Sequence, residues 1–378
     1  MRPLIFILLF RLSIPLTFGQ ATNDWDRLRR YAHAIGIDSL CAQPDRPCLT
    51  RYFTQIIYGR TPRRMGYQGV PEQVDTVRIH RLTQQFLSRS SATPGDWCAL
   101  LDSSESHDPH YQRLKSYCIR CLIDDYLADS LTLEQVQESL NTYRWLNRFP
   151  ADQRIIVNLP SATLRVVDRR GQTRLSSRVV VGKASTPTPQ FTAFVPSLVT
   201  YPYWNVPRSI AVKKLLPKIR RNPVPRLNAL NLQVIDAAGN VVDPARIDWR
   251  VPPAAFPYRL RQSTGCDNAL GVLKFNVTGP YDIYLHDTNV RRAFAGDYRH
   301  LSHGCIRVEK PVALANRLLG YARFNANYLT QCLINARPQT VTLPSAVPLF
   351  VIYNVLDTDE AGAVQVYPDV YHGWRLPM

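Results

Sequence analysis

Residues 281–287 read YDIYLHD, and residues 302–307 read SHGCIR. The first stretch has the side chains of a short β-strand and ends in His286 and Asp287. The second stretch begins 16 residues after His286 and carries another histidine two positions before Cys305. A strand that delivers one histidine, followed closely by a second histidine and a cysteine, predicts a reactive site built on a sheet.

Cys305 is the candidate nucleophile of this site. A thiol attacks as its thiolate, so it needs a nearby base or a positive field, and His286 and His303 are the available imidazoles. The backbone at Gly304 allows a substrate to approach closely, so the amides of residues 304 and 305 could stabilise an oxyanion. Arg307 could bind a substrate carboxylate through two hydrogen bonds. Together, these residues predict a site for acyl transfer.

Other roles for these residues are weaker. A lone cysteine is more often a buried apolar residue or half of a disulfide, and a lone histidine is more often structural. Four residue types in one tight cluster favour chemistry instead. A zinc site made of His286, His303 and Cys305 lacks a fourth ligand and a second-shell pattern, so no metal is predicted.

The first part of the chain has a helical pattern from about residue 24 to residue 149. Thr132 followed by Gln135 resembles a capping box, and apolar residues then recur at helical spacing. Nothing in this part gathers His, Cys and carboxylates at catalytic spacing. We therefore assign residues 20–150 to a helical scaffold domain.

After Pro150 the sequence changes to short β-rich runs, which predicts an α+β chain with a sheet domain at 151–336. Residues 337–378 supply a last strand and a tail that complete it. A stretch rich in proline and basic residues, about 207–257, predicts an inserted capping subdomain or lid, because long connections without a role are uncommon. Strands are expected at 154–158, 163–167, 178–181, 232–235, 271–275, 281–285 and 349–355, and a helix at 311–319.

Residues 1–19 combine a basic start with an apolar run and read as a signal peptide that is removed on export. No later segment supplies about 20 apolar residues in a row, so no membrane span is expected in the mature protein. The expected location is the cell envelope, most naturally the periplasm.

The formal net charge of +17 favours an anionic partner. Nucleic acid is not predicted, because the basic residues are dispersed and no recognition motif is present. A carboxylate-rich cell wall or an anionic membrane surface fits better, and a merely solubilising charge stays open. The expected oligomeric state is a monomer.

Eight cysteines in an exported chain permit disulfides. If Cys305 stays reduced, an odd number remains and at least one more is unpaired. Cys118 and Cys121 lie on an apolar helical stripe, which favours a core or disulfide role over a metal site. Cys266, near the lid, either pairs with another cysteine or lies near the site.

These motifs resemble the L,D-transpeptidases that carry the YkuD-type catalytic domain. The signature of that family is a His, followed at a distance by Ser or Thr-His-Gly-Cys, an apolar residue and Asn or Arg, and the residues above match it throughout. The chain also resembles the larger periplasmic members, which have a helical scaffold and an inserted capping subdomain. This wider resemblance lies in residues 155–160, 180–183, 204–207, 268–271, 274–275 and 283–287. The peptidoglycan-binding module of many larger members is not recognisable.

The resemblance implies a β-sandwich catalytic domain in which Cys305 attacks the L,D peptide bond of a tetrapeptide stem and releases D-alanine. His286 would be the base, oriented by the backbone carbonyl of Asp287. His303, Gly304 and the cysteine itself would surround the oxyanion. No cofactor is implied.

The resemblance also implies the substrate contacts and the partner. Arg307, Ser302 and Lys274 would bind the substrate, which is a peptidoglycan stem peptide. Transfer to the side-chain amine of a second stem would form a 3-3 crosslink. Water or a lipoprotein amine as acceptor would instead make a carboxypeptidase or a protein-to-wall ligase, and a non-catalytic wall-binding protein is a further alternative.

Overall fold

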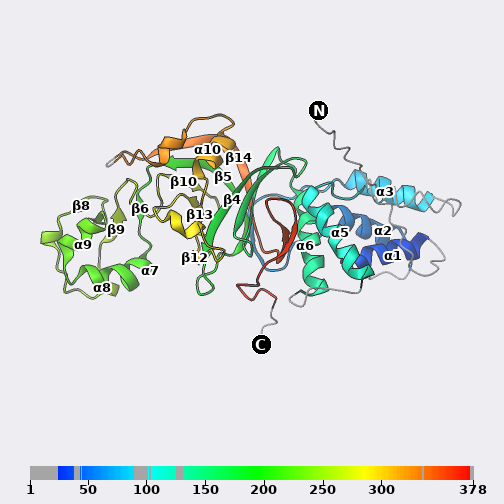
Figure 1. Cartoon of the computed structure of the whole chain (residues 1–378), viewed down its shortest axis with the longest axis horizontal. Coiled ribbons are helices and arrows are strands. Elements are labelled where there is room, and N and C mark those ends of the chain that lie inside the picture. Colours follow the sequence, from blue (N-terminus) through cyan, green and yellow to red (C-terminus); the bar gives the residue numbers. More distant parts are fainter. Residues whose placement is uncertain are drawn as a thin grey trace, which may run out of the picture.

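The computed structural model describes residues 24–37, 43, 45–88, 101, 104–124, 131–333 and 336–374. Three parts follow one another along the longest axis of the molecule (Figure 1). A helical part lies at one end, a curled sheet in the middle, and a small subdomain at the other end. The predicted signal peptide, residues 1–19, lies outside the described residues.

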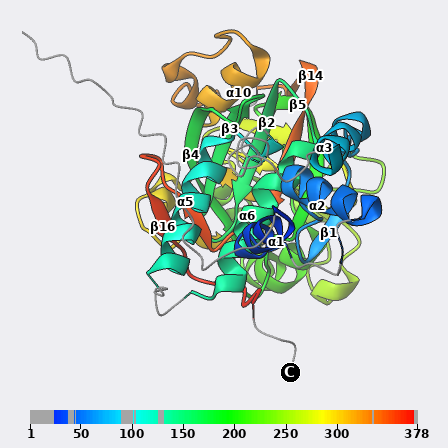
Figure 2. The ribbon, with the colours of Figure 1, turned by 90° about the vertical axis from the view of Figure 1, so that its right-hand side faces the viewer.

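The helical part packs its helices against one end of the sheet (Figure 2). The capping box at α6 is confirmed: the Thr132 hydroxyl accepts from the Gln135 amide, and the Gln135 side chain accepts from the Thr132 amide. Its elements are α1 (Asp24–Ala34), α2 (Arg46–Tyr58), α3 (Thr76–Ser88), α5 (Pro109–Ile123), α6 (Leu133–Trp145) and the 3-10 turn η1 (Leu146–Arg148). None of the helices that the structure describes is long and apolar enough to cross a membrane.

A single sheet forms the body of the second part. Its order is β1-β5-β10-β11-β13-β4-β3-β2-β14, and β14 also pairs with β5, so the sheet curls back on itself. The two layers of the expected sandwich are therefore continuous, and the α+β fold class is confirmed. The strands are β1 (Met65–Gln68), β2 (Gln153–Asn158), β3 (Thr163–Asp168), β4 (Thr173–Gly182), β5 (Gln190–Thr200), β10 (Leu273–Asn276), β11 (Leu285–His286), β12 (His300–Ser302), β13 (Ile306–Val308) and β14 (Gln339–Ile352).

Two long strands differ from the sequence prediction. The strand β5 was not expected at all, and β14 begins at Gln339 rather than at residue 349. Prolines explain both, because Pro196 lies inside β5 and Pro344 lies where the pairing of β14 is interrupted. β1, in the helical part of the sequence, was also missed, and it pairs with β5.

The strand expected at 281–285 is mostly wrong. Only Leu285–His286 pairs with neighbouring strands. The ring of Tyr281 instead packs against Phe191 and Tyr67, with ring centroids 5.5 and 6.4 Å away. The helix expected at 311–319 is confirmed as α10 (Pro311–Leu319).

The capping subdomain has its own core and its own four-stranded sheet, in the order β6-β9-β7-β8. Leu216, Ile219 and Val234 are fully buried in it. Its sheet includes 204–205 and 259–262, beyond the expected limits of 207–257. Its elements are β6 (Trp204–Asn205), α7 (Arg208–Ile210), η2 (Ala211–Leu215), α8 (Leu216–Ile219), α9 (Pro223–Ala229), β7 (Leu232–Ile235), β8 (Val241–Val242) and β9 (Arg259–Gln262).

The structure shows which of several cysteines are in disulfides and which are free thiols. Cys266 pairs with Cys332, so the segment that returns from the lid is tied to the connection between α10 and β14. Cys118 is a buried free thiol in α5, and Cys121 is a partly buried one. Cys48 is also in a disulfide.

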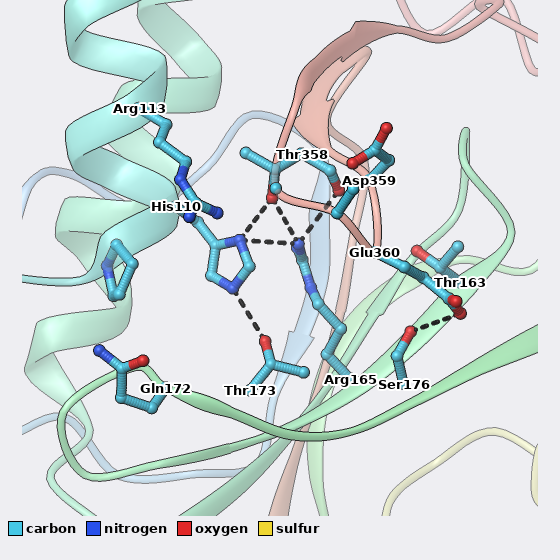
Figure 3. Close-up of a pocket in the computed structure, with 13 residues that line it drawn as sticks. His110, Arg113, Thr163, Arg165, Gln172, Thr173, Ser176, Thr358, Asp359 and Glu360 are labelled. Carbon is cyan, nitrogen blue, oxygen red and sulfur yellow. Dashed lines mark hydrogen bonds between the residues drawn. The ribbon is translucent and has the colours of Figure 1, made fainter. Parts of the chain in front are cut away.

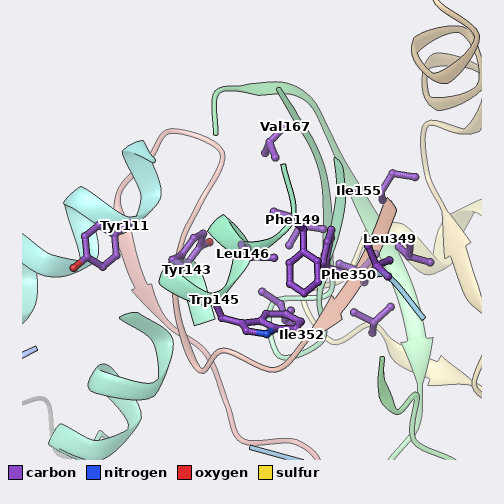
Figure 4. Packing of buried hydrophobic residues seen from close by; sticks show 14 of the residues in the cluster. Tyr111, Tyr143, Trp145, Leu146, Phe149, Ile155, Val167, Leu349, Phe350 and Ile352 are labelled. Carbon is purple, nitrogen blue, oxygen red and sulfur yellow. The ribbon is translucent and has the colours of Figure 1, made fainter. Parts of the chain in front are cut away.

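Aromatic rings seal the junction between the helices and the sheet (Figure 4). Trp145 at the end of α6 packs edge-on against Phe149 at 4.8 Å and against Phe350 of β14 at 5.9 Å. All three side chains are buried. This contact joins the last helix of the scaffold to the longest strand of the sheet.

A buried ion pair lies beside these rings. Arg165 of β3 contacts Asp357 of β15 (Leu356–Thr358) at 2.8 Å, and both side chains are almost fully buried. Tyr143 of α6 donates to the same carboxylate at 2.5 Å.

His110 of α5 contacts Thr358 and lies 3.0 Å from Thr173 of β4; Figure 3 shows these contacts. Burial lowers the pKa of His110 to about 4, so this imidazole is neutral near pH 7.

Asp357→Asn is expected to reduce the free energy of unfolding by about 3–5 kcal/mol, because it leaves the Arg165 guanidinium buried without its counter-charge. Urea unfolding followed by circular dichroism would measure this. The matched control is Glu134→Gln, which breaks an exposed 2.5 Å pair with Arg63 and should cost less than about 1 kcal/mol. Equal losses in the two variants would contradict a special role for the buried pair.

Candidate active site

The loop of residues 302–305 connects β12 to β13 and presents Cys305. Gly304 has φ +118°, a conformation that strongly favours glycine. The Ser302 hydroxyl donates to the Cys305 carbonyl at 2.6 Å and accepts from the Gly304 amide at 3.1 Å. A single side chain therefore closes the loop that carries the thiol.

These bonds correct two expectations. The Gly304 amide donates to Ser302, so it is not free to stabilise an oxyanion. The Ser302 side chain is buried, and its hydroxyl is used within the loop rather than for binding a substrate. The amide of Cys305 has no hydrogen-bond partner among the described residues and remains the backbone donor of this loop.

Thr188 supports the loop from the side. Its hydroxyl donates to the Gly304 carbonyl at 2.8 Å and accepts from the Gly182 amide, at the end of β4, at 2.9 Å. The Tyr371 hydroxyl in turn donates to the Gly182 carbonyl. Sequence reasoning missed both side chains, and no motif marks them, because they meet the loop only in the folded chain.

His286 lies in β11 with its ring buried. Its Nδ1 is 2.5 Å from the Asp287 carbonyl oxygen, which can only accept, so Nδ1 carries the proton and Nε2 holds a free lone pair. Burial, and then the Arg307 guanidinium, lower the pKa of His286 to about 3. The imidazole is therefore neutral near pH 7, the form in which it can accept a proton.

Asp287 has a structural carboxylate as well as the orienting carbonyl. The carboxylate accepts from the Val272 amide at 3.0 Å and pairs with Arg291. Gly271 has φ +59°, and a side chain there would collide with this carboxylate. Burial raises the pKa of Asp287. These contacts hold the segment that orients His286.

Cys305 is largely enclosed. Its thiol lies 3.5 Å from the Asp282 carbonyl, to which it donates. Burial raises its pKa, whereas hydrogen bonds from Tyr284 and the charge of Lys274 lower it. The resting group is thus a thiol near cationic and donor groups, with the Lys274 ammonium 4.4 Å from the centre of the Tyr284 ring.

The sheet register brings Lys274, His286 and Arg307 into one row. Lys274 of β10 and Arg307 of β13 are each paired with His286 of β11, so the three side chains lie on the same face. The Arg307 guanidinium has no hydrogen bond or ion pair with another described residue, and burial lowers its pKa. This row can receive negative charge beside the thiol.

His303 is not part of this row, because it lies in the loop between β12 and β13. It is exposed, and its Nε2 is 2.5 Å from the Lys214 ammonium of the lid. Burial and then Lys214 lower its pKa. The base is predicted to be His286 rather than His303, because only His286 is buried and oriented by a carbonyl.

No three His, Cys, Asp or Glu side chains lie close enough to hold a metal ion within the part of the chain that the structure describes. Sequence reasoning did not identify Tyr284 or Lys214 as site residues. Tyr284 stands two positions before His286 in the strand-like run, which was a usable signal. No local sequence signal marked Lys214, because this residue belongs to the inserted lid and is distant from the motif in the sequence.

Comparison with known families places this site in a recognised domain. Residues 152–339 match the model of the YkuD family, described as the L,D-transpeptidase catalytic domain. A Haemophilus influenzae protein whose name marks it as a candidate L,D-transpeptidase is 40% identical over 217 residues. That alignment covers 57% of this chain and 44% of the relative, so the chain spans less than half of the relative's length.

Solved structures are more distant. The L,D-transpeptidase from Mycobacterium smegmatis is 15% identical, with coverage of 53% of this chain and 59% of that chain and a TM-score of 0.23. The catalytic domain of the Enterococcus faecium L,D-transpeptidase, solved acylated by ertapenem, is 13% identical, with coverage of 53% and 97% and a TM-score of 0.25. Similarity at this level adds nothing to the family match.

Lys274→Met is expected to raise the pKa of Cys305 further, because the ammonium is a positive charge that favours the thiolate. The pH profile of Cys305 alkylation by iodoacetamide, read by intact mass, should move to higher pH. Lys213→Met is the control, because this exposed lid lysine is not among the groups that shift Cys305. An unchanged pH profile in the Lys274 variant would contradict the expectation that this ammonium stabilises the Cys305 thiolate.

Proposed function

Because the chain belongs to the YkuD family of L,D-transpeptidase catalytic domains through residues 152–339, we propose that it is a peptidoglycan L,D-transpeptidase acting through Cys305. The donor is a tetrapeptide stem, and the acceptor is the side-chain amine of a diamino acid in a second stem. The product is a 3-3 crosslink. The observation that carries the proposal is a cysteine in a closed loop that leads into β13, the strand paired with the one that carries a buried, neutral and oriented histidine.

Acylation begins with the thiol. Cys305 attacks the carbonyl carbon of the L,D peptide bond as its proton passes to Nε2 of His286. The negative charge that develops on the oxygen is met by the Cys305 amide. The C–N bond then breaks, the departing amine of D-alanine takes the proton from His286, and a thioester remains.

Transfer reverses the proton path. The acceptor amine attacks the thioester carbonyl and gives a proton to His286, the C–S bond breaks, and the leaving thiolate recovers that proton. Two partly buried cations, Lys274 and Arg307, bind stem carboxylates on the sheet side of the site. The stem must shed water here, which strengthens these charge interactions.

The alternative functions share the acyl-enzyme and differ in the group that accepts the acyl chain. Water in place of the amine would make an L,D-carboxypeptidase, and a lipoprotein amine would make a ligase that links proteins to the wall. We propose the stem amine because the lid lies next to the cysteine loop through Lys214 and His303 and can limit the access of water. Export by residues 1–19 to the periplasm is part of the same proposal, because the substrate is there.

Mass analysis of products from purified tetrapeptide stems tests reaction and acceptor together. The wild-type protein should release D-alanine and form a crosslinked dimer, whereas Cys305→Ala should do neither while keeping its fold. Release of D-alanine with a hydrolysed tripeptide as the sole product would favour the carboxypeptidase. Turnover by Cys305→Ala at the wild-type rate would refute the mechanism.

Carbapenems give a second test that needs no native substrate. The strained lactam is an acyl donor, so Cys305 should open it to a thioester, and family membership implies that carbapenems react far more readily than penicillins. Intact mass should show one adduct on the wild type and none on Cys305→Ala. An adduct on Cys118 or Cys121 with Cys305 untouched would mean that the nucleophile is wrongly assigned.

A further inference from the structure

The lid contributes a side chain to the site. Lys214 belongs to η2, a π-helical segment between α7 and α8, and its ammonium donates to Nε2 of His303, two residues before the nucleophile. Single π-helical turns are rare and occur frequently at functional sites. Lys213 and Lys214 are both exposed, but only the Lys214 ammonium contacts His303, so the backbone directs one of two adjacent lysines to this position.

The lid is itself strongly cationic. Residues 204–262 carry eleven Lys and Arg against three Asp and no Glu. Such a field raises the local concentration of anions near the site. An insertion that served only to exclude water would not need this charge.

Cationic groups lie on both sides of the nucleophile. Neighbouring strands run in the order β10, β11, β13, β4. Lys274 comes from β10, on one side of Cys305, whereas Lys183 follows the end of β4 on the other side. The Lys183 amide donates to the Ser302 carbonyl at 3.1 Å, which places Lys183 next to the loop that carries His303, and its charge helps to lower the pKa of that imidazole. The Lys183 ammonium has no hydrogen-bond or ion-pair partner among the described residues.

We propose that Lys214 of the lid, with Lys183, forms a carboxylate-binding subsite next to His303, on the side of Cys305 opposite Lys274. This inference rests on the proposed function, because the carboxylate is one of those on the stem peptide. The neutral His303 imidazole holds the ammonium while no stem is bound. A carboxylate is a stronger acceptor than a neutral imidazole, so an arriving stem displaces His303 from Lys214.

The subsite couples the lid to the substrate. An ammonium carried by the lid reaches the stem only when the lid lies over the cysteine loop, as it does here. Binding of the carboxylate therefore favours the closed position, because the ligand interacts differently with the two lid positions. Lys214 thus acts as a specificity-determining residue that makes closure depend on the charge of the stem.

The test compares Lys214→Met with Lys213→Met in the full chain. The donors are the tetrapeptide stem with all carboxylates free and a series of the same peptide amidated at one carboxylate at a time. The measured quantity is kcat/KM for release of D-alanine. On the free stem, Lys214→Met should lose about 10- to 100-fold, the worth of a hydrogen bond to a charged group, and Lys213→Met less than about threefold.

The amidated series separates recognition from structure. One amidated peptide should lose the same factor with the wild type and be insensitive to Lys214→Met, which identifies the bound carboxylate. If Lys214→Met reduced kcat/KM by the same factor on every peptide, or on none of them, the proposed subsite would be overturned. Binding of the free stem to Cys305→Ala and to Cys305→Ala/Lys214→Met, by calorimetry, should show the same difference in Kd.

The two proposals fail in different ways. A wild-type protein that neither binds the stem nor releases D-alanine refutes the transpeptidase and the subsite with it. A wild type that turns the stem over while Lys214→Met matches it on every peptide refutes the subsite alone.

Discussion

The buried Arg165–Asp357 pair of the sheet part, together with Tyr143 of α6 and His110 of α5, joins the sheet to the helical part. Arg165 comes from β3, Asp357 follows β14, and Tyr143 of α6 donates to the same carboxylate. Removing these charges from water is costly, so the pair is favourable only where every partner is present. Because β3 pairs with β4, and the end of β4 supports the Cys305 loop through Thr188, the position of Cys305 depends on this junction.

The candidate site has one side built on the sheet and another side formed by the lid. On the sheet side, β10, β11 and β13 hold Lys274, His286 and Arg307 in one row, with the histidine oriented by a carbonyl. The other side is the lid, which has a separate hydrophobic core and reaches the cysteine loop through Lys214. The Cys266–Cys332 disulfide anchors the base of the returning segment. The side chains proposed for chemistry thus stand on strands, whereas the lid proposed to close over them is a separate unit.

Local sequence signals predicted some elements well and failed at others for physical reasons. The α6 capping box and α10 follow from short-range preferences that tertiary contacts do not override. The prolines in β5 and β14 contradict strand propensity, yet the sheet tolerates them near interruptions of pairing. Residues 281–284 look like a strand but leave the ladder, because the Tyr281 ring packs into the core and the Asp282 carbonyl faces the thiol.

The sequence by itself determined the candidate nucleophile, the candidate base and the class of chemistry that they predict. Cys305, His286, His303 and Arg307 lie close together along the chain, and their functional groups are fixed by residue type. Only the tertiary structure decided which groups are available. Within the loop, the Ser302 hydroxyl donates to the Cys305 carbonyl and accepts from the Gly304 amide. Thr188 and Lys214 contact the loop from segments that are distant in the sequence. Such roles depend on hydrogen bonds between residues far apart in sequence, and no local pattern encodes which of many equivalent donors will meet a given acceptor.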